Sequence, residues 1–334
     1  MKKLAKFLML ALIIPCALFF SACTLSIKLY DKEGDYIYFG EYPQTIKAEN
    51  VTVSEKPDKN GYYKGSDGHK YAKLKAVTSS SVENTGLMSD GSSIVANEYY
   101  YFKVEPIKWR ILKTDNDTAI LITDVAIDVV DWQKNYNEVD GDWYCNDSDV
   151  PENTYATNYK YSAMRKFLNN DFYNTFTKLE KTIIKKSVVD NSAATTISPE
   201  QNDYVCENTN DYVYIPSFMD LYNEDYGFGS QLGTNPQTGF PYQDEKRAFR
   251  VTDYAKAKGC ITLTQELMDL YVEADPEMQA LKQDWLVESA AVWTRSPYGD
   301  GSICVSGLLI GFAYDNVEVN YNGFSITPMI KIKL

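Results

Sequence analysis

The residues able to do reactive chemistry are few in this chain of 334 residues. Histidine is the commonest general base, but His69 is the only histidine and lies in the polar stretch GSDGHKY. A single imidazole excludes zinc sites that need several histidines. No GxSxG elbow, P-loop or HExxH motif occurs either. We therefore expect His69 to be an exposed surface residue.

Cysteine is the second reactive residue type, with six copies. Cys16 and Cys23 fall in an N-terminal export signal described below. The four that remain for the folded protein are Cys145, Cys206, Cys260 and Cys304. None has the CxxC spacing of a zinc site, so we predict no metal ion and no cofactor. Outside the cytoplasm four cysteines can form two disulfides in three connectivities, with free thiols as the alternative.

The segment VWTRSPYGDG, residues 292–301, places a tryptophan and an arginine two positions apart. On a strand, Trp293 and Arg295 then point to the same face. Arginine can stack on an indole or pair with a carboxylate. We predict a structural role, with Trp293 in the core and Arg295 satisfying a buried acid or carbonyl groups. Asp253 is the candidate acid.

Two loops are candidates for ligand contact. The loop that follows Arg295 carries Tyr298 and Asp300 and is the better candidate. The stretch DGDWYCNDSD (140–149) is rich in oxygen ligands that suit calcium. Neither loop has the ordered ligand spacing of an EF-hand, and exposed loops of an acidic protein have the same composition.

An export signal occupies residues 1–22. Three lysines precede an apolar run over 7–20, and Ser21-Ala22-Cys23 follows, as in bacterial lipoproteins. We expect cleavage before Cys23 and acylation of its thiol, because two acyl chains are enough for stable anchoring. Residues 23–35 would form a lipidated N-terminus and a short tether. The predicted location is the cell membrane, lipid-anchored and facing the extracytoplasmic side.

The charge of the chain limits its partners. The formal net charge is −13, and removing the signal removes three lysines and no acid. Such a chain is repelled by nucleic acid and by anionic headgroups, so we predict no nucleic-acid partner. The membrane would be contacted through the lipid alone.

Strand patterns near both ends predict antiparallel hairpins. Two β-rich runs within 107–124 flank Asp115-Asn116-Asp117, which indicates one hairpin. Near the C-terminus apolar and polar residues alternate on both sides of Asn322-Gly323, which predicts a second.

The middle of the chain has helical patterns. Apolar residues recur at helical spacing over 164–176, with a candidate break at 169–171. Thr177 with Glu180 forms a capping box, and 217–220 indicates another helix start. Asp275-Pro276 predicts a helix that runs to about Ser289. Strands flanking helices without βαβ alternation predict one α+β domain over 36–334, with a helical insertion at about 263–291.

Six motifs in order resemble a known family. They are YFGEYPQ (38–44), EPIKWRIL (105–112), MRKFLNNDFYNTF (164–176), YVYIPS (212–217), RVTDYAKAKG (250–259) and WTRSP (293–297). Together they resemble the bacterial domain of unknown function 6273 over about residues 36–332. The second motif contains Trp109 and Arg110, which we expect to be part of the fold like the Trp293 motif. Thr327 stands where such domains often carry arginine before the last strand.

The resemblance implies a fold similar to C-type lectins and formylglycine-generating enzymes: a twisted antiparallel sheet with flanking helices and much irregular loop. It also implies an exported protein. We therefore expect a non-catalytic surface domain that binds a carbohydrate, an envelope polymer or a protein. The alternatives are an oxidase of the formylglycine-generating type, which would need a close pair of copper-binding thiolates, and a hydrolase that uses carboxylates.

Overall fold

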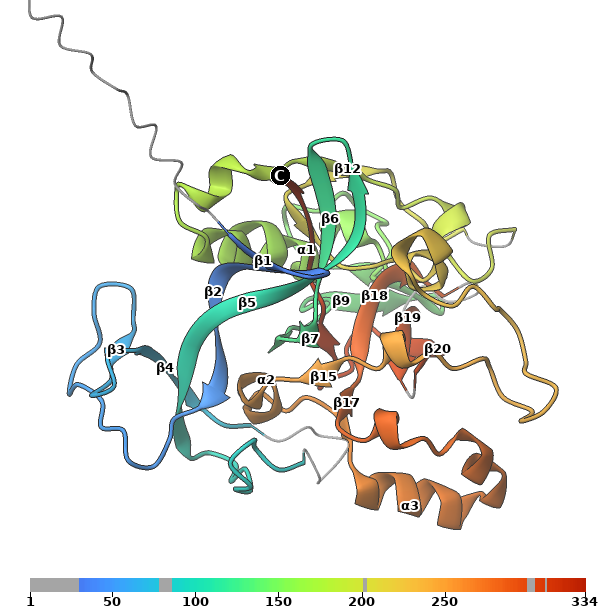
Figure 1. Cartoon of the computed structure of the whole chain (residues 1–334). Helices are drawn as coiled ribbons and strands as arrows, with labels where there is room; N and C mark the ends of the chain where they lie inside the picture. Colours follow the sequence, from blue (N-terminus) through green and yellow to red (C-terminus); the bar gives the residue numbers. More distant parts are fainter. Residues whose placement is uncertain (1–29, 78–85, 201–202, 299–303, 310) are drawn as a thin grey trace, which may run out of the picture.

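The computed structural model describes residues 30–77, 86–200, 203–298, 304–309 and 311–334 (Figure 1). The predicted export signal, Cys23 and Asp300 lie outside these ranges. Among the described residues, no helix combines the length and apolar character that a membrane span requires.

A large antiparallel sheet forms the framework of the described structure. Its strands are β1 (Asp31–Glu33), β2 (Tyr36–Ile46), β3 (Tyr63–Lys64), β4 (Lys70–Lys75), β5 (Tyr99–Asp115), β6 (Thr118–Thr123), β11 (Ile184–Lys185), β14 (Val213–Tyr214) and β22 (Met329–Lys333). The main order is β1-β2-β5-β6-β22-β11, with β4 beside β5 and β14 beside β22. In Figure 1 the long strand β5 curves through the molecule and joins the β3–β4 hairpin to the centre.

Smaller sheets complete the strand structure. One has the order β20-β19-β18-β21-β8, a second β16-β17-β15-β7, and two hairpins pair β9 with β10 and β12 with β13. The bounds are β7 Val125–Ala126, β8 Asp128–Val129, β9 Tyr136–Val139, β10 Asp142–Cys145, β12 Ser187–Val189, β13 Thr209–Asp211, β15 Arg250–Val251, β16 Thr262–Leu263, β17 Ser289–Ala290, β18 Val292–Pro297, β19 Cys304–Leu309, β20 Phe312–Glu318 and β21 Ser325–Ile326. Two of these pairs, β15 with β7 and β18 with β21, are parallel.

The helices are short. The α-helices are α1 (Ala163–Phe167), α2 (Asp253–Ala257) and α3 (Gln265–Ala274), and a π-helical turn spans η2 (Leu168–Phe172). The 3₁₀ turns are η1 Tyr159–Tyr161, η3 Tyr173–Thr175, η4 Glu180–Thr182, η5 Ala193–Thr195, η6 Met219–Tyr222, η7 Glu224–Tyr226, η8 Glu245–Arg247, η9 Pro276–Leu281 and η10 Asp284–Leu286. Antiparallel sheets, few helices and long irregular connections make this an α+β protein, as predicted.

Local signals placed several of these elements correctly. The hairpin at 107–124 is β5–β6, where Asp115 pairs with Thr118 and Asn116 adopts a φ of 48°. Asparagine tolerates this left-handed conformation better than most residues. The helical run continues through the candidate break, which is the π-helical turn rather than an interruption.

Capping residues also act as expected. Thr177 and Glu180 exchange hydrogen bonds, with Thr177 N–H donating to the carboxylate at 2.7 Å. Ser217 and Asp220 make the same reciprocal pair.

Three local predictions were wrong. Asn322-Gly323 does not close a hairpin, because β20 pairs with β19 while β21 pairs with β18 and β8. The helix at Asp275-Pro276 ends at Leu281 and is 3₁₀. Part of the predicted tether, β1, belongs to the sheet. At Asn322-Gly323, pairing of β21 with the distant strands β18 and β8 overrode the local pattern.

Candidate functional site

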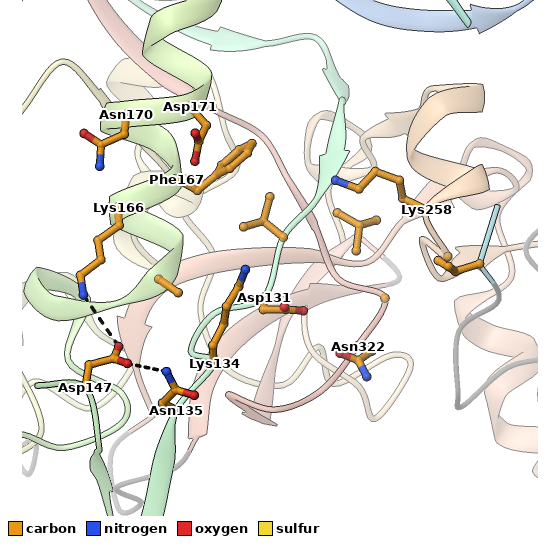
Figure 2. A pocket seen from close by; sticks show the side chains of 16 residues that line it. Asp131, Lys134, Asn135, Asp147, Lys166, Phe167, Asn170, Asp171, Lys258 and Asn322 are labelled. Atoms are coloured by element: carbon orange, nitrogen blue, oxygen red, sulfur yellow. Dashed lines mark hydrogen bonds and ion pairs between the residues drawn. The ribbon is translucent and has the colours of Figure 1, made fainter. Parts of the chain in front are cut away.

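A polar cleft of about 760 Å³ opens between α1, the loop after β8 and the loop before β21 (Figure 2). Five separate segments build it, at 129–135, 147, 163–171, 258–259 and 322–323, with Val77 at the edge. The residues labelled in Figure 2 are Asp131, Lys134, Asn135, Asp147, Lys166, Phe167, Asn170, Asp171, Lys258 and Asn322. Three lysines and three aspartates therefore line the cleft, so its formal charge is balanced.

One end of the cleft is held by a hydrogen-bonded cluster. Asn135 donates its amide N–H to Asp147, and the Lys166 ammonium lies 3.7 Å from the same carboxylate. Lys166 also pairs with Asp149 at 2.9 Å. The N-cap residue Ser162 fixes the first turn of α1 by accepting a hydrogen bond from the Arg165 N–H. Figure 2 marks the two contacts of Asp147.

At the opposite side of the cleft, a buried carboxylate holds Lys258 in place. Its ammonium pairs with Asp128, which is 1% exposed. The Tyr42 hydroxyl donates to the other oxygen of Asp128 at 2.5 Å. Burial and the charge of Asp128 hold the pKa of Tyr42 well above its usual range, so Tyr42 remains a donor.

The middle of the cleft has polar side chains that are not used by the fold. Among the described residues, no hydrogen bond or ion pair satisfies the side chains of Asp131, Lys134, Asn170, Asp171 and Asn322. Figure 2 shows Lys134 and the ring of Phe167 directed into the space between the helix and the β8 loop. The cleft thus offers amides, carboxylates and an ammonium group beside one aromatic ring.

Two glycines shape the rim. Gly259 has a φ of 88° and Gly323 a φ of 101°, which side chains with a Cβ rarely adopt. The Gly323 carbonyl accepts the N–H of Ile261 at 2.8 Å. This bond ties the loop before β21 to the segment that follows Lys258.

The Trp293 motif lies in the core, as predicted. Trp293 is fully buried and its indole N–H donates to the carbonyl of Val130, which lines the cleft. Arg295 is also buried, but Asp253 is not its partner. The carboxylate is Asp220, at 2.6 Å from the guanidinium.

Asp253 has another structural role. Its carboxylate accepts hydrogen bonds from Ile46 N–H, Ser89 N–H and the Ser89 hydroxyl. It therefore joins the end of β2 and the loop at 89 to the start of α2. Spacing alone could not identify the partner, because Asp253 is nearer to Arg295 in the sequence than Asp220 and yet is not the paired acid.

Of the two alternatives for the cysteines, disulfides or free thiols, the described residues have the second: Cys145, Cys206 and Cys260 are free thiols. The Cys145 sulfur accepts a hydrogen bond from Gln133, while Cys260 is fully buried beside the Ile261 carbonyl. Burial raises the thiol pKa of all three, and that of Cys260 to about 12. These thiols are protonated at neutral pH, which disfavours both metal binding and nucleophilic attack. The side chain of Cys304 lies outside the described residues.

The other residues singled out in the sequence do not line the polar cleft. Tyr298 follows β18 and is half-buried, and the Asp300 position is not described. His69 is exposed, as predicted. Trp109 is buried and Arg110 lies on the opposite face of β5. In the described part of the chain, no three acidic, cysteine or histidine residues gather as a metal site would require.

Sequence reasoning missed the polar cleft itself. Asp147 lies in the Asp-rich stretch considered for calcium, and Phe167 to Asp171 lie in a helical motif interpreted as core packing. The helical spacing was correct for Met164 and Leu168, which are fully buried. Asn170 and Asp171 lie on the other face of the same turn, and these two polar residues were the sequence signal for the cleft.

Comparison with known proteins gives a family match. A family model described as Domain of unknown function (DUF6273) matches residues 116–333. No curated protein and no solved structure matches. All residues of the polar cleft except Val77 fall within the matched region.

Proposed function

The chain belongs to the family of domains of unknown function DUF6273, and we propose that it is a bacterial surface lipoprotein whose domain binds a carbohydrate in the polar cleft. The carbohydrate would be free or part of an envelope polymer. The lipid anchor at Cys23 and the extracytoplasmic location belong to this proposal and rest on the export signal. A fold like that of C-type lectins also remains a prediction.

The observation that carries the proposal is the contrast within the cleft. Its two ends are held by Asp147 and Asp128, whereas the side chains between them have no partner among the described residues. Amide side chains both donate and accept hydrogen bonds, and ionised carboxylates accept them, so together they can pair with neighbouring hydroxyls. The Phe167 ring offers an apolar face for the C–H side of a sugar. A polar site whose formal charges balance suits a neutral, hydroxyl-rich ligand.

A second candidate function is supported by two of these groups. Asp131 and Asp171 line the same cleft without a partner among the described residues, and paired carboxylates are the catalytic groups of most glycoside hydrolases. A hydrolase would bind the same ligand class and then cleave it.

The direct test is a binding screen of the purified protein against glycans and fragments of envelope polymers, followed by calorimetry. For a ligand that binds, we expect Asn170→Ala and Asn322→Ala to weaken affinity about tenfold each, the effect of about 1.4 kcal/mol. Asn210→Ala is the matched control, since Asn210 is exposed on β13 and away from the cleft.

The results of these experiments distinguish a binding domain from a hydrolase. Binding without product release, lost in the two cleft variants and kept in Asn210→Ala, supports the binding domain. Release of a shortened glycan that Asp131→Asn and Asp171→Asn abolish supports the hydrolase. Equal affinity of all variants would remove the cleft from both hypotheses.

A further inference from the structure

A second hollow, of about 610 Å³, lies beside β6, β11 and β22 and shares no lining residue with the polar cleft. We name it the lysine hollow after Lys185, Lys186 and Lys331 on its wall. In a chain with a net charge of −13, three lysines in one hollow are unexpected.

Two of these lysines face each other across the sheet. Lys185 of β11 is directly opposite Lys331 of β22 in the antiparallel register. Directly opposed side chains have Cβ atoms about 4.5–5.5 Å apart, and like charges at such positions destabilise the sheet. No carboxylate pairs with either ammonium group in the described part of the chain. The fold thus maintains an unfavourable charge pair at the edge of a hollow.

Two further cationic residues, Lys186 and Arg295, also line the lysine hollow. Lys186 lies over the Tyr212 ring at 5.6 Å. The floor is formed by Arg295, whose guanidinium is paired with Asp220. Four of its five N–H groups donate to the Asp190 carbonyl, the Ile215 carbonyl and Asp220. Among the described residues, no acceptor takes the fifth of the five guanidinium N–H donors.

Acidic residues in the hollow do not cancel this charge. Asp220 is neutralised by Arg295, which leaves Asp117 and Asp190 against the three lysines. The side chain of Asp190 already accepts the N–H of Ser192. A small excess of positive charge therefore remains, in contrast to the balanced polar cleft.

We propose that the lysine hollow binds a phosphate group carried by a small sugar or polyol. A phosphate between Lys185 and Lys331 converts their repulsion into two charge-assisted hydrogen bonds. The remaining volume of the hollow accommodates the polyol, with the Tyr214 and Tyr226 side chains on its wall. This site is independent of the carbohydrate cleft, and either can fail without the other.

The test uses the purified protein with inorganic phosphate and glycerol 3-phosphate as probes. Thermal unfolding is measured in each probe and in sodium chloride of equal ionic strength. A ligand that binds only the folded state raises Tm by mass action. We expect both probes to raise Tm above the chloride value, with glycerol 3-phosphate giving the larger shift.

Lysine variants test whether the Tm shift comes from binding in the lysine hollow. Lys185→Met and Lys331→Met keep the aliphatic stem and are expected to weaken phosphate binding about tenfold each, because charge-assisted bonds are lost. Without phosphate, each variant should unfold at or above the wild-type Tm, since the like-charge contact is gone. Lys333→Met is the matched control, because Lys333 is on the same strand but does not line the hollow.

Three results would overturn the proposal. One is a phosphate shift no greater than that of chloride. Another is an equal loss of binding in Lys333→Met. The third is unchanged binding in both hollow variants. Lys185 is exposed, so its substitution is tolerated by the fold and keeps the test decisive if Lys331→Met misfolds.

Discussion

Two Trp–Arg pairs, Trp109 with Arg110 on β5 and Trp293 with Arg295 on β18, look alike in sequence and differ in the structure. Both indoles are fully buried, and each donates its N–H to a backbone carbonyl, Phe39 at 2.8 Å and Val130 at 3.1 Å. The tryptophans therefore have the same role: large core side chains whose polar atom is satisfied.

The two arginines lie in different surroundings because they are spaced differently from their tryptophans. Adjacent residues on a strand point to opposite faces, so Arg110 leaves the core that holds Trp109. It lies over the rings of Phe228 and Phe249 and donates to the Lys246 carbonyl at 3.1 Å. Arg295, two residues from its tryptophan, is buried and ion-paired with Asp220.

The comparison shows that a shared motif does not fix how a charge is stabilised. Arg110 is held mainly by aromatic faces, and its Nε atom has no hydrogen-bond partner among the described residues. Arg295 is held by one carboxylate and two carbonyl groups and also forms the floor of the lysine hollow. Substitutions at the two positions should therefore have unequal effects.

Arg295→Met should give the largest effect. It removes the guanidinium that pairs with Asp220 and donates to two carbonyl groups, and breaking a buried ion pair costs about 3 kcal/mol or more. Urea denaturation of the purified variant measures this loss of unfolding free energy. Arg295→Lys should recover only part of it, because one ammonium group cannot reach acceptors on three segments. Full recovery with lysine would show that charge alone matters.

Arg110→Met should cost less, about 1 kcal/mol, since only cation–π contacts and one hydrogen bond are lost. Arg110→Lys should be close to wild type in the same urea experiment. If the Arg110 and Arg295 variants lost equal stability, the distinction drawn between the pairs would be wrong.

The smallest effect at neutral pH should come from a buried group that titrates only at alkaline pH, unlike either arginine. Burial raises the pKa of Cys260 to about 12 in the folded protein, against an ordinary value near 9. Between these pH values the unfolded chain has lost the proton that the folded chain keeps, so stability falls as pH rises, by at most about 1.4 kcal/mol per pH unit. Tyrosines with a raised pKa, such as the half-buried Tyr226 at about 12, add to the same fall.

Cys260→Ala separates the thiol from the tyrosines. The slope of unfolding free energy against pH should be shallower in the variant above pH 9, and unchanged below it. Because alanine leaves a small cavity, the slopes are compared and not the absolute values. Identical slopes would mean that the Cys260 thiol does not titrate differently in the two states.

The sequence by itself determined the features that depend on neighbouring residues. The β5–β6 turn, the Thr177–Glu180 capping box, the helical spacing of Met164 and Leu168, and the α+β class follow from local stereochemistry and periodicity. The family was also evident, because its motifs are read in order along one chain.

Only the tertiary structure decided the features that join distant segments. Asp220 rather than Asp253 meets Arg295, and Asn322-Gly323 lies on the rim of the polar cleft instead of closing a hairpin. That cleft brings together five segments, and the opposition of Lys185 and Lys331 depends on strand register. Sequence periodicity specifies which face a side chain occupies, whereas long-range packing selects which segments share that face.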